Sequence, residues 1–485
     1  MISTWWWSMQ KRIHVSWIVA TFAGSIVVGV AIASAWNFNS ISWLLVGLVS
    51  LVFAAWRGRR WVVPIVIVGG VCVGLWRGSV DQTAMSIYSS IIHEVHEVRG
   101  SVRNDAGVTG SGLQSLELEI LSVDGHDETG QIWVTTARQA TIQRGDIVTM
   151  SGKIQEGFGI YGASMYRTEI IKIERPNPGD LGVRFRDWFS DGVRVAVQEP
   201  QASLGLGFLT GQRSALPESL DEALIIAGLT HIVVASGYNL TILVRFARRS
   251  FVRISKYLAT LAGGMMIAGF VMITGFSPSM SRAALVTGLS LVAWYYGRRF
   301  HPIVLLAIVA AITVLIKPYY VWGDLGWYLS FAAFAGVMLF APLLQRYFFG
   351  SAQPSGARQL LGETVAAQIA TLPIVAVAFG VVSNVALVAN LLVVPLIPLA
   401  MLLTFIAGIA GLAIPNLAHI VGWPAEQLLG YMVRISELLA SLPWAQNDVV
   451  IPVWVGVGAY AILVSTGIYM YRVTRYRFDD SSIID

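Results

Sequence analysis

Arg282 lies in a segment whose residue types favour the binding of an anion. It follows the run FSPSMS at residues 276–281, in which Ser277 fits a helix N-cap and Pro278 fits the first turn. Unpaired N–H groups at a helix N-terminus favour anions, and an arginine in the first turns adds a fixed positive charge. The segment predicts an arginine that contacts phosphate or forms an ion pair. The alternative is an arginine that only reaches towards the membrane interface.

A polar segment, GLTHIVVASGYNLT at residues 228–241, interrupts an apolar stretch. Its candidate side chains are His231, Ser236, Tyr238 and Asn239. Irregular backbone at membrane depth is tolerated only where protein or a water-filled cavity surrounds it, so the segment predicts a polar path. His231 and Ser236 are five residues apart and do not share a helical face, so a nucleophilic Ser–His pair is not predicted. A histidine with a purely structural role is the alternative.

Arg213, Asp324 and Ser330 complete the candidate residues of this path. Arg213 ends the run GLGFLTGQR, whose glycines we expect to serve close packing, because no Gly-Lys-Ser/Thr follows them. Residues 223–323 contain no Asp or Glu, so Asp324 is the next acid and a candidate partner of Arg282 or Lys317. The basic residues of that stretch suit a polyanion, although cytoplasmic loops carry Lys and Arg for topological reasons alone.

The composition requires a membrane around most of the chain. Of its 485 residues, 55% are hydrophobic and only 13% are charged, whereas a soluble domain carries roughly 25% charged residues. This excludes a soluble enzyme, a disordered tail and a secreted disulfide scaffold. We predict three transmembrane helices within residues 1–80 and a second transmembrane block at 204–472. The spans predicted in that block are 223–245, 257–275, 280–297, 302–316, 325–344, 361–379 and 450–471, with a helical hairpin at 384–414.

Clusters of Lys and Arg set the predicted orientation. The positive-inside rule assigns to the cytoplasm the basic residues at 57–60, 245–256, 298–299, 346–358 and 472–477. We therefore expect a multi-pass protein of the cell (inner) membrane whose segment after Ser79 is extracellular or periplasmic. The tail at 473–485 is then cytoplasmic.

Residues 98–175 differ from the rest, because short alternating stretches separated by glycines replace the apolar runs. This pattern predicts a small antiparallel β domain, and a five-stranded OB-like barrel fits its length; a generic β-sandwich is the alternative. Nine basic and eleven acidic residues between 99 and 184 give a net charge unfavourable for tight nonspecific DNA binding. Four aromatic residues could still stack on single-stranded bases: Trp133, Phe158, Tyr161 and Tyr166. Gating or partner docking is an equally good role for this domain.

Two further segments have amphipathic helical spacing. Residues 181–198 place aromatic residues at helical intervals among charged ones, which predicts an interfacial helix; a helix packed on the β domain is the alternative. Residues 421–442 are also expected to lie in the interface. The single Cys72 permits neither an intrachain disulfide nor a Cys-based metal site, and no metal or other cofactor is predicted.

Four motifs, in this order after three spans and a β domain, resemble the ComEC family of competence proteins. They are LGFLTGQR at 206–213, GLTHIVVASG at 228–237, SPSMSRA at 277–283 and LSF at 329–331. The sequence departs from the family pattern at Tyr238-Asn239, where a His usually follows Ser-Gly-Leu, and at Tyr328, where a Gln usually precedes Leu-Ser-Phe. Many members also carry a metallo-β-lactamase-like nuclease domain, whose His-x-His-x-Asp-His cluster does not occur here.

The resemblance implies an inner-membrane channel that passes single-stranded DNA into the cytoplasm during natural transformation, and not an enzyme. The implied partners are single-stranded DNA, membrane lipids, a cytoplasmic DNA motor or helicase, an extracellular DNA receptor, a separate nuclease and further copies of the chain. One alternative is a transporter or membrane enzyme acting on a lipid-linked or polyanionic envelope substrate. Another is a non-transporting scaffold, which predicts that Arg282 and His231 tolerate substitution.

Overall fold

The computed structural model divides the chain into two compact units. The first contains Met1–Leu181 and Ile303–Trp327, and the second contains Gly182–Pro302 and Tyr328–Asp485. The structure describes residues 14–35, 40–57, 59–85, 91–108, 112–137, 142–159, 161–176, 179–212, 216–233, 236–275, 277–298, 300–350 and 355–476. Most of the predicted cytoplasmic tail therefore lies outside the described residues.

Apolar helices dominate the described ranges. Seven of the helices there are long and apolar enough to cross a membrane: Val15–Ala33, Val63–Asp81, Lys256–Thr274, Leu325–Phe349, Arg358–Phe379, Ala386–Ala413 and Val453–Thr474. Shorter apolar helices cover Ser42–Ala54 and Pro302–Ile316. The predicted fold class is confirmed to the extent of a mostly helical chain with helices able to cross a membrane and a small β-sheet domain.

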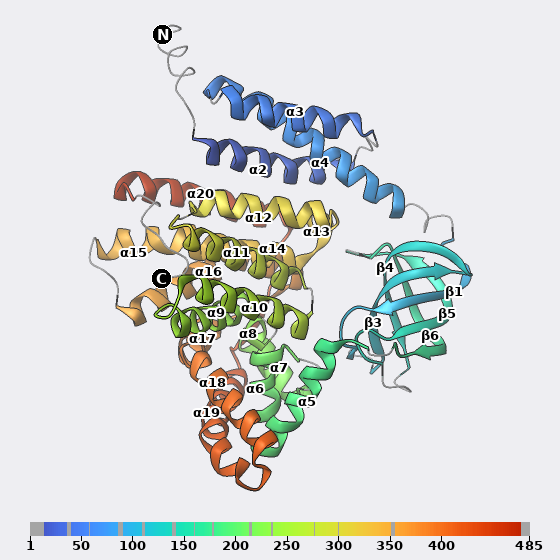
Figure 1. The fold of residues 1–485 in the computed structure, drawn as a ribbon, viewed down its shortest axis with the longest axis vertical. Helices are drawn as coiled ribbons and strands as arrows, with labels where there is room; N and C mark the ends of the chain where they lie inside the picture. The colour runs from blue at the N-terminus through green and yellow to red at the C-terminus, as the bar shows by residue number, and fades with distance from the viewer. Residues whose placement is uncertain are drawn as a thin grey trace. The chain divides into compact units, whose positions relative to one another are not determined.

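Close backbone packing and capped helix ends hold the helices of the first unit together. These helices are α2 (Val15–Ala33), α3 (Ser42–Arg57), α4 (Val63–Met85), α12 (Pro302–Ile316) and α13 (Tyr320–Gly323). Both α2 and α3 pack on α4 (Figure 1). A Cβ on Gly74 would overlap the Ile26 carbonyl, so glycine lets α4 approach α2 closely. Arg77 donates through Nε to the Leu315 carbonyl at 2.8 Å and so satisfies the C-terminal end of α12.

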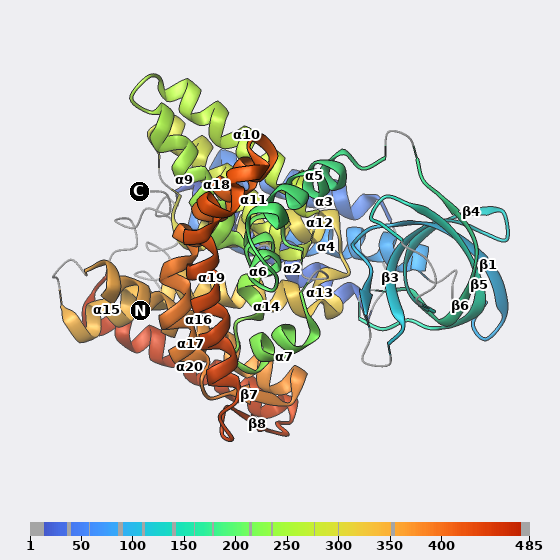
Figure 2. The ribbon, with the colours of Figure 1, turned by 90° about the horizontal axis from the view of Figure 1, so that it is seen from below.

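The β domain of the first unit contains β1 (Val95–Val102), β2 (Gly107–Val108), β3 (Gln114–Val123), β4 (His126–Thr136), β5 (Ile147–Glu156) and β6 (Ala163–Glu174). The strand order is β1-β5-β6-β4-β3-β2, and β1 also pairs with β3. The β4–β6 pair is parallel and the other pairs are antiparallel. Figure 2 shows these strands curving around a common centre, where alternate residues such as Leu116, Leu118 and Met150 are buried.

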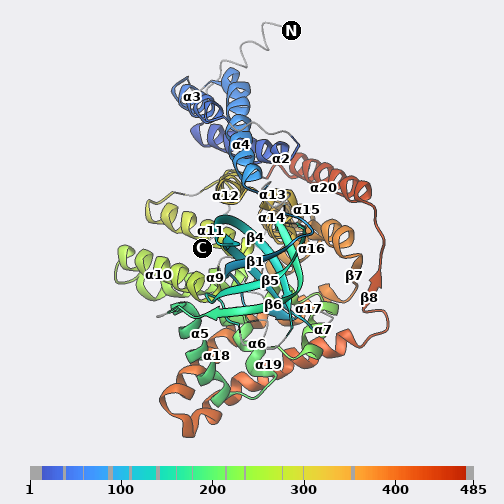
Figure 3. The same ribbon diagram turned by 90° about the vertical axis from the view of Figure 1, so that its right-hand side faces the viewer.

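The second unit contains the remaining elements. Its helices are α5 (Leu181–Ala196), α6 (Gln201–Thr210), α7 (Glu218–Ile226), α8 (Thr230–Val233), α9 (Gly237–Phe251), α10 (Lys256–Thr274), α11 (Pro278–Tyr295), α14 (Leu325–Ala335), the π-helical turn η3 (Gly336–Phe340), α15 (Ala341–Phe349), α16 (Gly356–Phe379), α17 (Ala386–Val393), α18 (Ile397–Ala413), α19 (Ala418–Ala440) and α20 (Val453–Thr474). Figure 3 shows α9, α10 and α11 side by side, and the short strands β7 (Val381–Ser383) and β8 (Gln446–Asp448) paired.

The helix predicted for 181–198 packs one face against α18. Phe189 of α5 stacks on Phe405 of α18 with 5.9 Å between ring centroids. A Cβ on Gly411 would overlap the Gly192 carbonyl, so the two backbones touch. Phe185 and Trp188, which lie up to one turn before Phe189 on α5, are exposed. This exposed aromatic face is the part of α5 that is available to an interface.

Two predicted spans are wrong in their internal structure. The predicted hairpin at 384–414 is one apolar helical segment, in which the 3₁₀ turn Val394–Leu396 joins α17 to α18. Pro395 and Pro398 lie in the first turns of their helical segments, where their missing N–H groups cost no helical hydrogen bond, so the chain does not reverse there. The reversal occurs after α18, which packs on α19. The predicted span 223–245 is divided among α7, α8 and α9, because Gly228 ends α7 in the left-handed conformation (φ 69°).

Candidate functional site

Arg282 lies in the second turn of α11 and holds that helix against α14. The side chain of Ser277 accepts a hydrogen bond from the Met280 N–H at 3.2 Å, which confirms the predicted N-cap. Arg282 donates through Nε to the Ser330 hydroxyl at 2.5 Å. Its guanidinium lies 5.4 Å from the centre of the Phe334 ring. Among the described residues of its own unit, no carboxylate pairs with Arg282, so its positive charge is not neutralised there.

The start of α9 lies against the same arginine. Ser236 caps this helix by accepting from the Asn239 N–H at 3.3 Å. An added Cβ on Gly237 would lie 3.0 Å from the Ala283 Cβ and 3.2 Å from Nη2 of Arg282, so glycine at this position favours the close approach of α9 to α11. Two helix N-termini and one guanidinium therefore meet in the second unit. Each N-terminus carries partial positive charge, which makes the cluster of Ser236, Gly237, Arg282 and Ser330 a candidate anion-binding site.

Asn239 connects this cluster to the preceding Gly-rich motif. Its side chain is fully buried, and Nδ2 donates to the Phe208 carbonyl of α6 at 3.0 Å. Gly211 ends α6 with φ 73°. The neighbouring Gln212 accepts from the Ser190 hydroxyl of α5 at 2.9 Å. The LGFLTGQR motif is thus fixed to both α9 and α5, and the position of Asn239 suits positioning of the backbone more than contact with a ligand.

The structure distributes the other predicted residues more widely. His231 is exposed on α8, and Tyr238 is exposed near the start of α9. Val234 and Ala235, which connect those two helices, and the predicted Arg213 lie outside the described residues. Tyr238 therefore belongs to α9, one of the helices that form the candidate site. His231 is close to that site only along the sequence.

Asp324 belongs to the first unit and has a local structural contact. Its Oδ1 accepts from the Trp327 N–H at 2.7 Å, where the chain enters α14. Trp327 in turn donates through Nε1 to the Thr313 hydroxyl of α12 at 3.0 Å. Burial raises the pKa of Asp324, although the hydrogen bond from Trp327 opposes that change. The carboxylate acts here as a helix cap.

The four aromatic residues predicted to stack on bases form one connected cluster on the β domain. Trp133 of β4 lies 5.5 Å from Phe158 and 5.5 Å from Tyr166, measured between ring centroids. Tyr161 lies 5.3 Å from Phe158. Phe158 and Tyr166 are 46% and 45% exposed, so the cluster offers ring surface to a ligand.

Arg103, Glu119 and Lys317 form a charged cluster between β3 and the α12–α13 connection. This cluster was not predicted from the sequence. Arg103 donates through Nε and Nη2 to both carboxylate oxygens of Glu119, at 2.9 and 2.7 Å. The ammonium of Lys317 lies 5.7 Å from the ring centres of both Tyr319 and Tyr320. The alternation of β3 indicates that Glu119 faces outward. Nothing in the sequence indicates that this face meets residue 317.

Electrostatics within this cluster disfavour the charged form of its lysine. Burial lowers the pKa of Lys317 to about 8, and the positive charge of Arg103 acts in the same direction. The hydrogen bond from Arg103 lowers the pKa of Glu119. The Arg103–Glu119 pair therefore stays charged at neutral pH, while Lys317 begins to lose its proton just above it.

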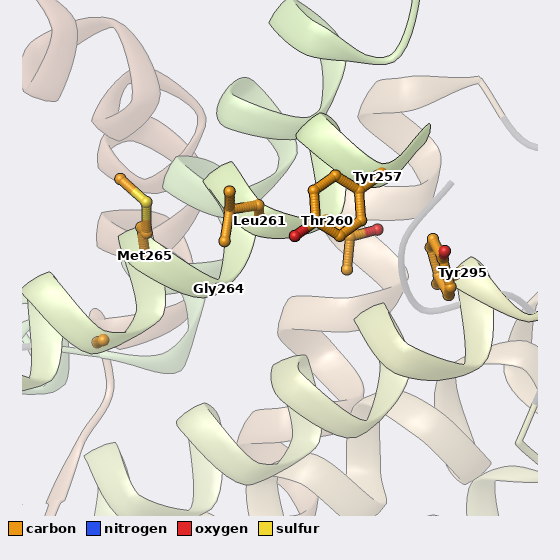
Figure 4. Close-up of a pocket in the computed structure, with 7 residues that line it drawn as sticks. Tyr257, Thr260, Leu261, Gly264, Met265 and Tyr295 are labelled. Atoms are coloured by element: carbon orange, nitrogen blue, oxygen red, sulfur yellow. The ribbon is translucent and has the colours of Figure 1, made fainter. Parts of the chain in front are cut away.

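An apolar groove of about 480 Å³ lies apart from these predicted residues. Its lining comes from α10 and α11 (Figure 4): Tyr257, Thr260, Leu261, Gly264, Met265 and Ala268 of α10, and Tyr295 of α11. No role was predicted for these residues from the sequence.

Comparison with known proteins places a family match over the candidate site. The family model described as competence protein matches residues 208–473, a range that includes Ser236, Arg282 and Ser330. ComE operon protein 3 of Bacillus subtilis (strain 168) is 26% identical over 218 residues, which are 43% of this chain and 27% of that protein. No solved structure matches the chain.

We expect the stability difference between the wild type and a Lys317→Met variant to change with pH. Below pH 8 both states hold the proton, and burial of the charge destabilises the folded state. Above the folded pKa of about 8, and below the unfolded value of 10.5, the unfolded state binds more protons, so stability rises with pH. The measurement is the thermal unfolding midpoint of the detergent-solubilised protein at pH 7 and at pH 10. From pH 7 to pH 10 the midpoint of the wild type should rise relative to that of the Lys317→Met variant. Lys172→Met, at an exposed site, is the control; a pH-independent difference for Lys317→Met would contradict the burial of this charge.

Proposed function

Because the chain belongs to the competence protein family, we propose that it is a cell-membrane channel through which single-stranded DNA enters the cytoplasm during natural transformation. The observation that carries this proposal is the Arg282 cluster, at which the starts of α9 and α11 meet a guanidinium with no carboxylate partner in the described part of its unit. The cluster suits a ligand that presents phosphate.

The chemistry of this cluster fits transient contact with a DNA backbone. Protein contacts to phosphate come from Arg side chains, hydroxyl groups and helix N-termini, and these contacts carry no base specificity. Ser330 contributes a hydroxyl group bonded to Arg282, and Ser236 contributes one at the start of α9. A single arginine with two helix ends binds one phosphate at a time, which suits a strand that must move on. Tyr238 and His231, both exposed, are further candidates for the walls of this path.

We also propose an orientation and a role for the β domain. Basic helix ends at residues 245–256 and 472–475 face the cytoplasm in this proposal, which puts the β domain outside and the C-terminal tail inside. The strand order, which returns from β3 to β1 and includes one parallel pair, supports an OB-type barrel. Its aromatic cluster would stack on bases and guide a single strand towards the membrane.

The proposal includes partners but no catalytic role for the chain. A cytoplasmic motor or helicase would move the DNA, and an extracellular DNA receptor would capture it. A separate nuclease would remove the second strand. These partners, and association with further copies of the chain, rest on the family resemblance. No cofactor enters the proposed mechanism.

Replacing Arg282 should stop DNA at the membrane without preventing its capture. We expect Arg282→Ala to reduce cytoplasmic uptake of labelled DNA at least about tenfold, since a hydrogen bond to a charged group contributes roughly 1.5–3 kcal/mol. Arg282→Lys keeps a charge but loses the fork of donors, so its uptake should be intermediate. The measurement separates surface-bound DNA from cytoplasmic DNA in cells with equal amounts of each variant.

Arg346→Ala, which removes another basic side chain of the second unit, is the matched control and should leave uptake unchanged. Normal uptake in a clean deletion would refute the channel. That outcome would favour a transporter or membrane enzyme acting on a lipid-linked or polyanionic envelope substrate. Normal uptake with Arg282→Ala alone would refute the role of this arginine.

The aromatic cluster of the β domain should increase affinity for single strands. We expect Phe158→Ala to weaken binding of an oligo-dT strand by the solubilised full-length chain about tenfold, because one stacked base contributes roughly 1–3 kcal/mol. Fluorescence anisotropy of the labelled strand gives the affinity. Trp188→Ala removes another exposed aromatic residue, on α5, and should have no effect. Equal affinities for the two variants would contradict base stacking on the β domain.

A further inference from the structure

The groove along α10 has the length and lining of a site for one hydrocarbon chain. The lining residues of α10 recur at helical intervals between residues 257 and 268 and so span about 16 Å of helix. This length is close to the thickness of one hydrocarbon leaflet, roughly 15 Å. Met265 is 66% exposed, and Figure 4 shows it and Tyr295 at opposite ends of the groove. Most of the membrane-length α10 is not buried inside the protein. The groove therefore opens towards the surroundings of α10, which in a membrane are lipid.

Positive charge lies at the end of the groove formed by Tyr257 and Tyr295. The Lys256 ammonium is 5.9 Å from the centre of the Tyr295 ring and 5.3 Å from that of Trp294. Arg249 and Arg253 precede it, and in the part of the chain that the structure describes no carboxylate pairs with any of these three cations. The whole stretch 223–323 contains no Asp or Glu. An anionic group at this end would meet the Lys256 ammonium, and the stretch that forms the groove contributes no acid.

We propose that this groove binds one anionic phospholipid, with an acyl chain along α10 and the phosphate headgroup at Lys256. Such a lipid is complementary to the site, because its acyl chain fits the apolar groove and its negative headgroup fits the cation at the end of the groove. A nucleic acid would use the cations but would leave the apolar groove empty. The aromatic rings of Trp294 and Tyr295 suit the boundary between headgroup and chain. This site is independent of the Arg282 cluster and does not rest on the proposed DNA transport.

Two variants separate the headgroup contact from the acyl-chain contact. Lys256→Gln removes the charge, and Gly264→Leu fills the groove; a Cβ on Gly264 meets nothing within 4 Å, so the added side chain enters open space. The full-length protein is reconstituted with equal amounts of phosphatidylglycerol and phosphatidylcholine and then delipidated with detergent. Native mass spectrometry measures the lipid that each protein retains. We expect the wild type to retain phosphatidylglycerol preferentially and each variant to retain about fivefold less of it.

Matched controls distinguish a site from general attraction to lipid. Gly269→Leu adds the same side chain to α10 outside the groove, again with nothing within 4 Å of its Cβ, and Arg472→Gln removes a cation from the end of α20. Both should retain lipid as the wild type does. Equal loss with Arg472→Gln and Lys256→Gln would overturn the proposal, as would full retention with Gly264→Leu. Release of the phosphatidylglycerol by an oligonucleotide, with no effect of Gly264→Leu, would assign the cations to nucleic acid instead.

Discussion

A helix that is interrupted at membrane depth must find partners for the N–H groups that the interruption releases, and this requirement organises the second unit. A serine hydroxyl accepts from one N–H in the first turn of each of α9 and α11, that of Asn239 and that of Met280. Gly237 allows the start of α9 to lie against Arg282, which is bonded to Ser330 of α14. Three helices therefore depend on one small polar cluster. The groups that stabilise these interruptions are also the groups that an anion would meet, which links the fold to the proposed passage of DNA.

The two proposed ligands of the second unit lie at opposite ends of the same helices. Arg282 lies near the starts of α9 and α11, whereas Lys256 lies near their C-terminal ends and at the start of α10. Neither end carries an acidic residue from this stretch of sequence. A lipid held at one end would fix the helices in one leaflet while the other end remains open to a moving strand. In the proposed mechanism, this separation would keep lipid phosphate from competing with DNA phosphate.

Local chemistry was predictable from the sequence, and contacts between distant segments were not. Ser277 and Pro278 indicate their helix start because a cap needs only the neighbouring residues. The aromatic residues at 133–166 could be named, but their joining into one cluster depends on the parallel pairing of β4 with β6. The hairpin at 384–414 was wrong because Pro395 and Pro398 fit the first turns of helical segments as well as they fit a reversal. Lys317 lies about two hundred residues from Arg103 and Glu119, and no local pattern connects it to them.

The central claim is that single-stranded DNA passes the Arg282 cluster, and site-specific photo-crosslinking during uptake tests it most directly. A photoreactive amino acid replaces Tyr238, exposed at the start of α9, or Tyr257, exposed in the groove of α10. Cells are illuminated while labelled DNA enters, and the protein is purified and analysed for attached DNA. The account predicts DNA crosslinks at position 238 and not at position 257. Crosslinks at neither position, or equally at both, while uptake proceeds normally, would contradict a path beside Arg282.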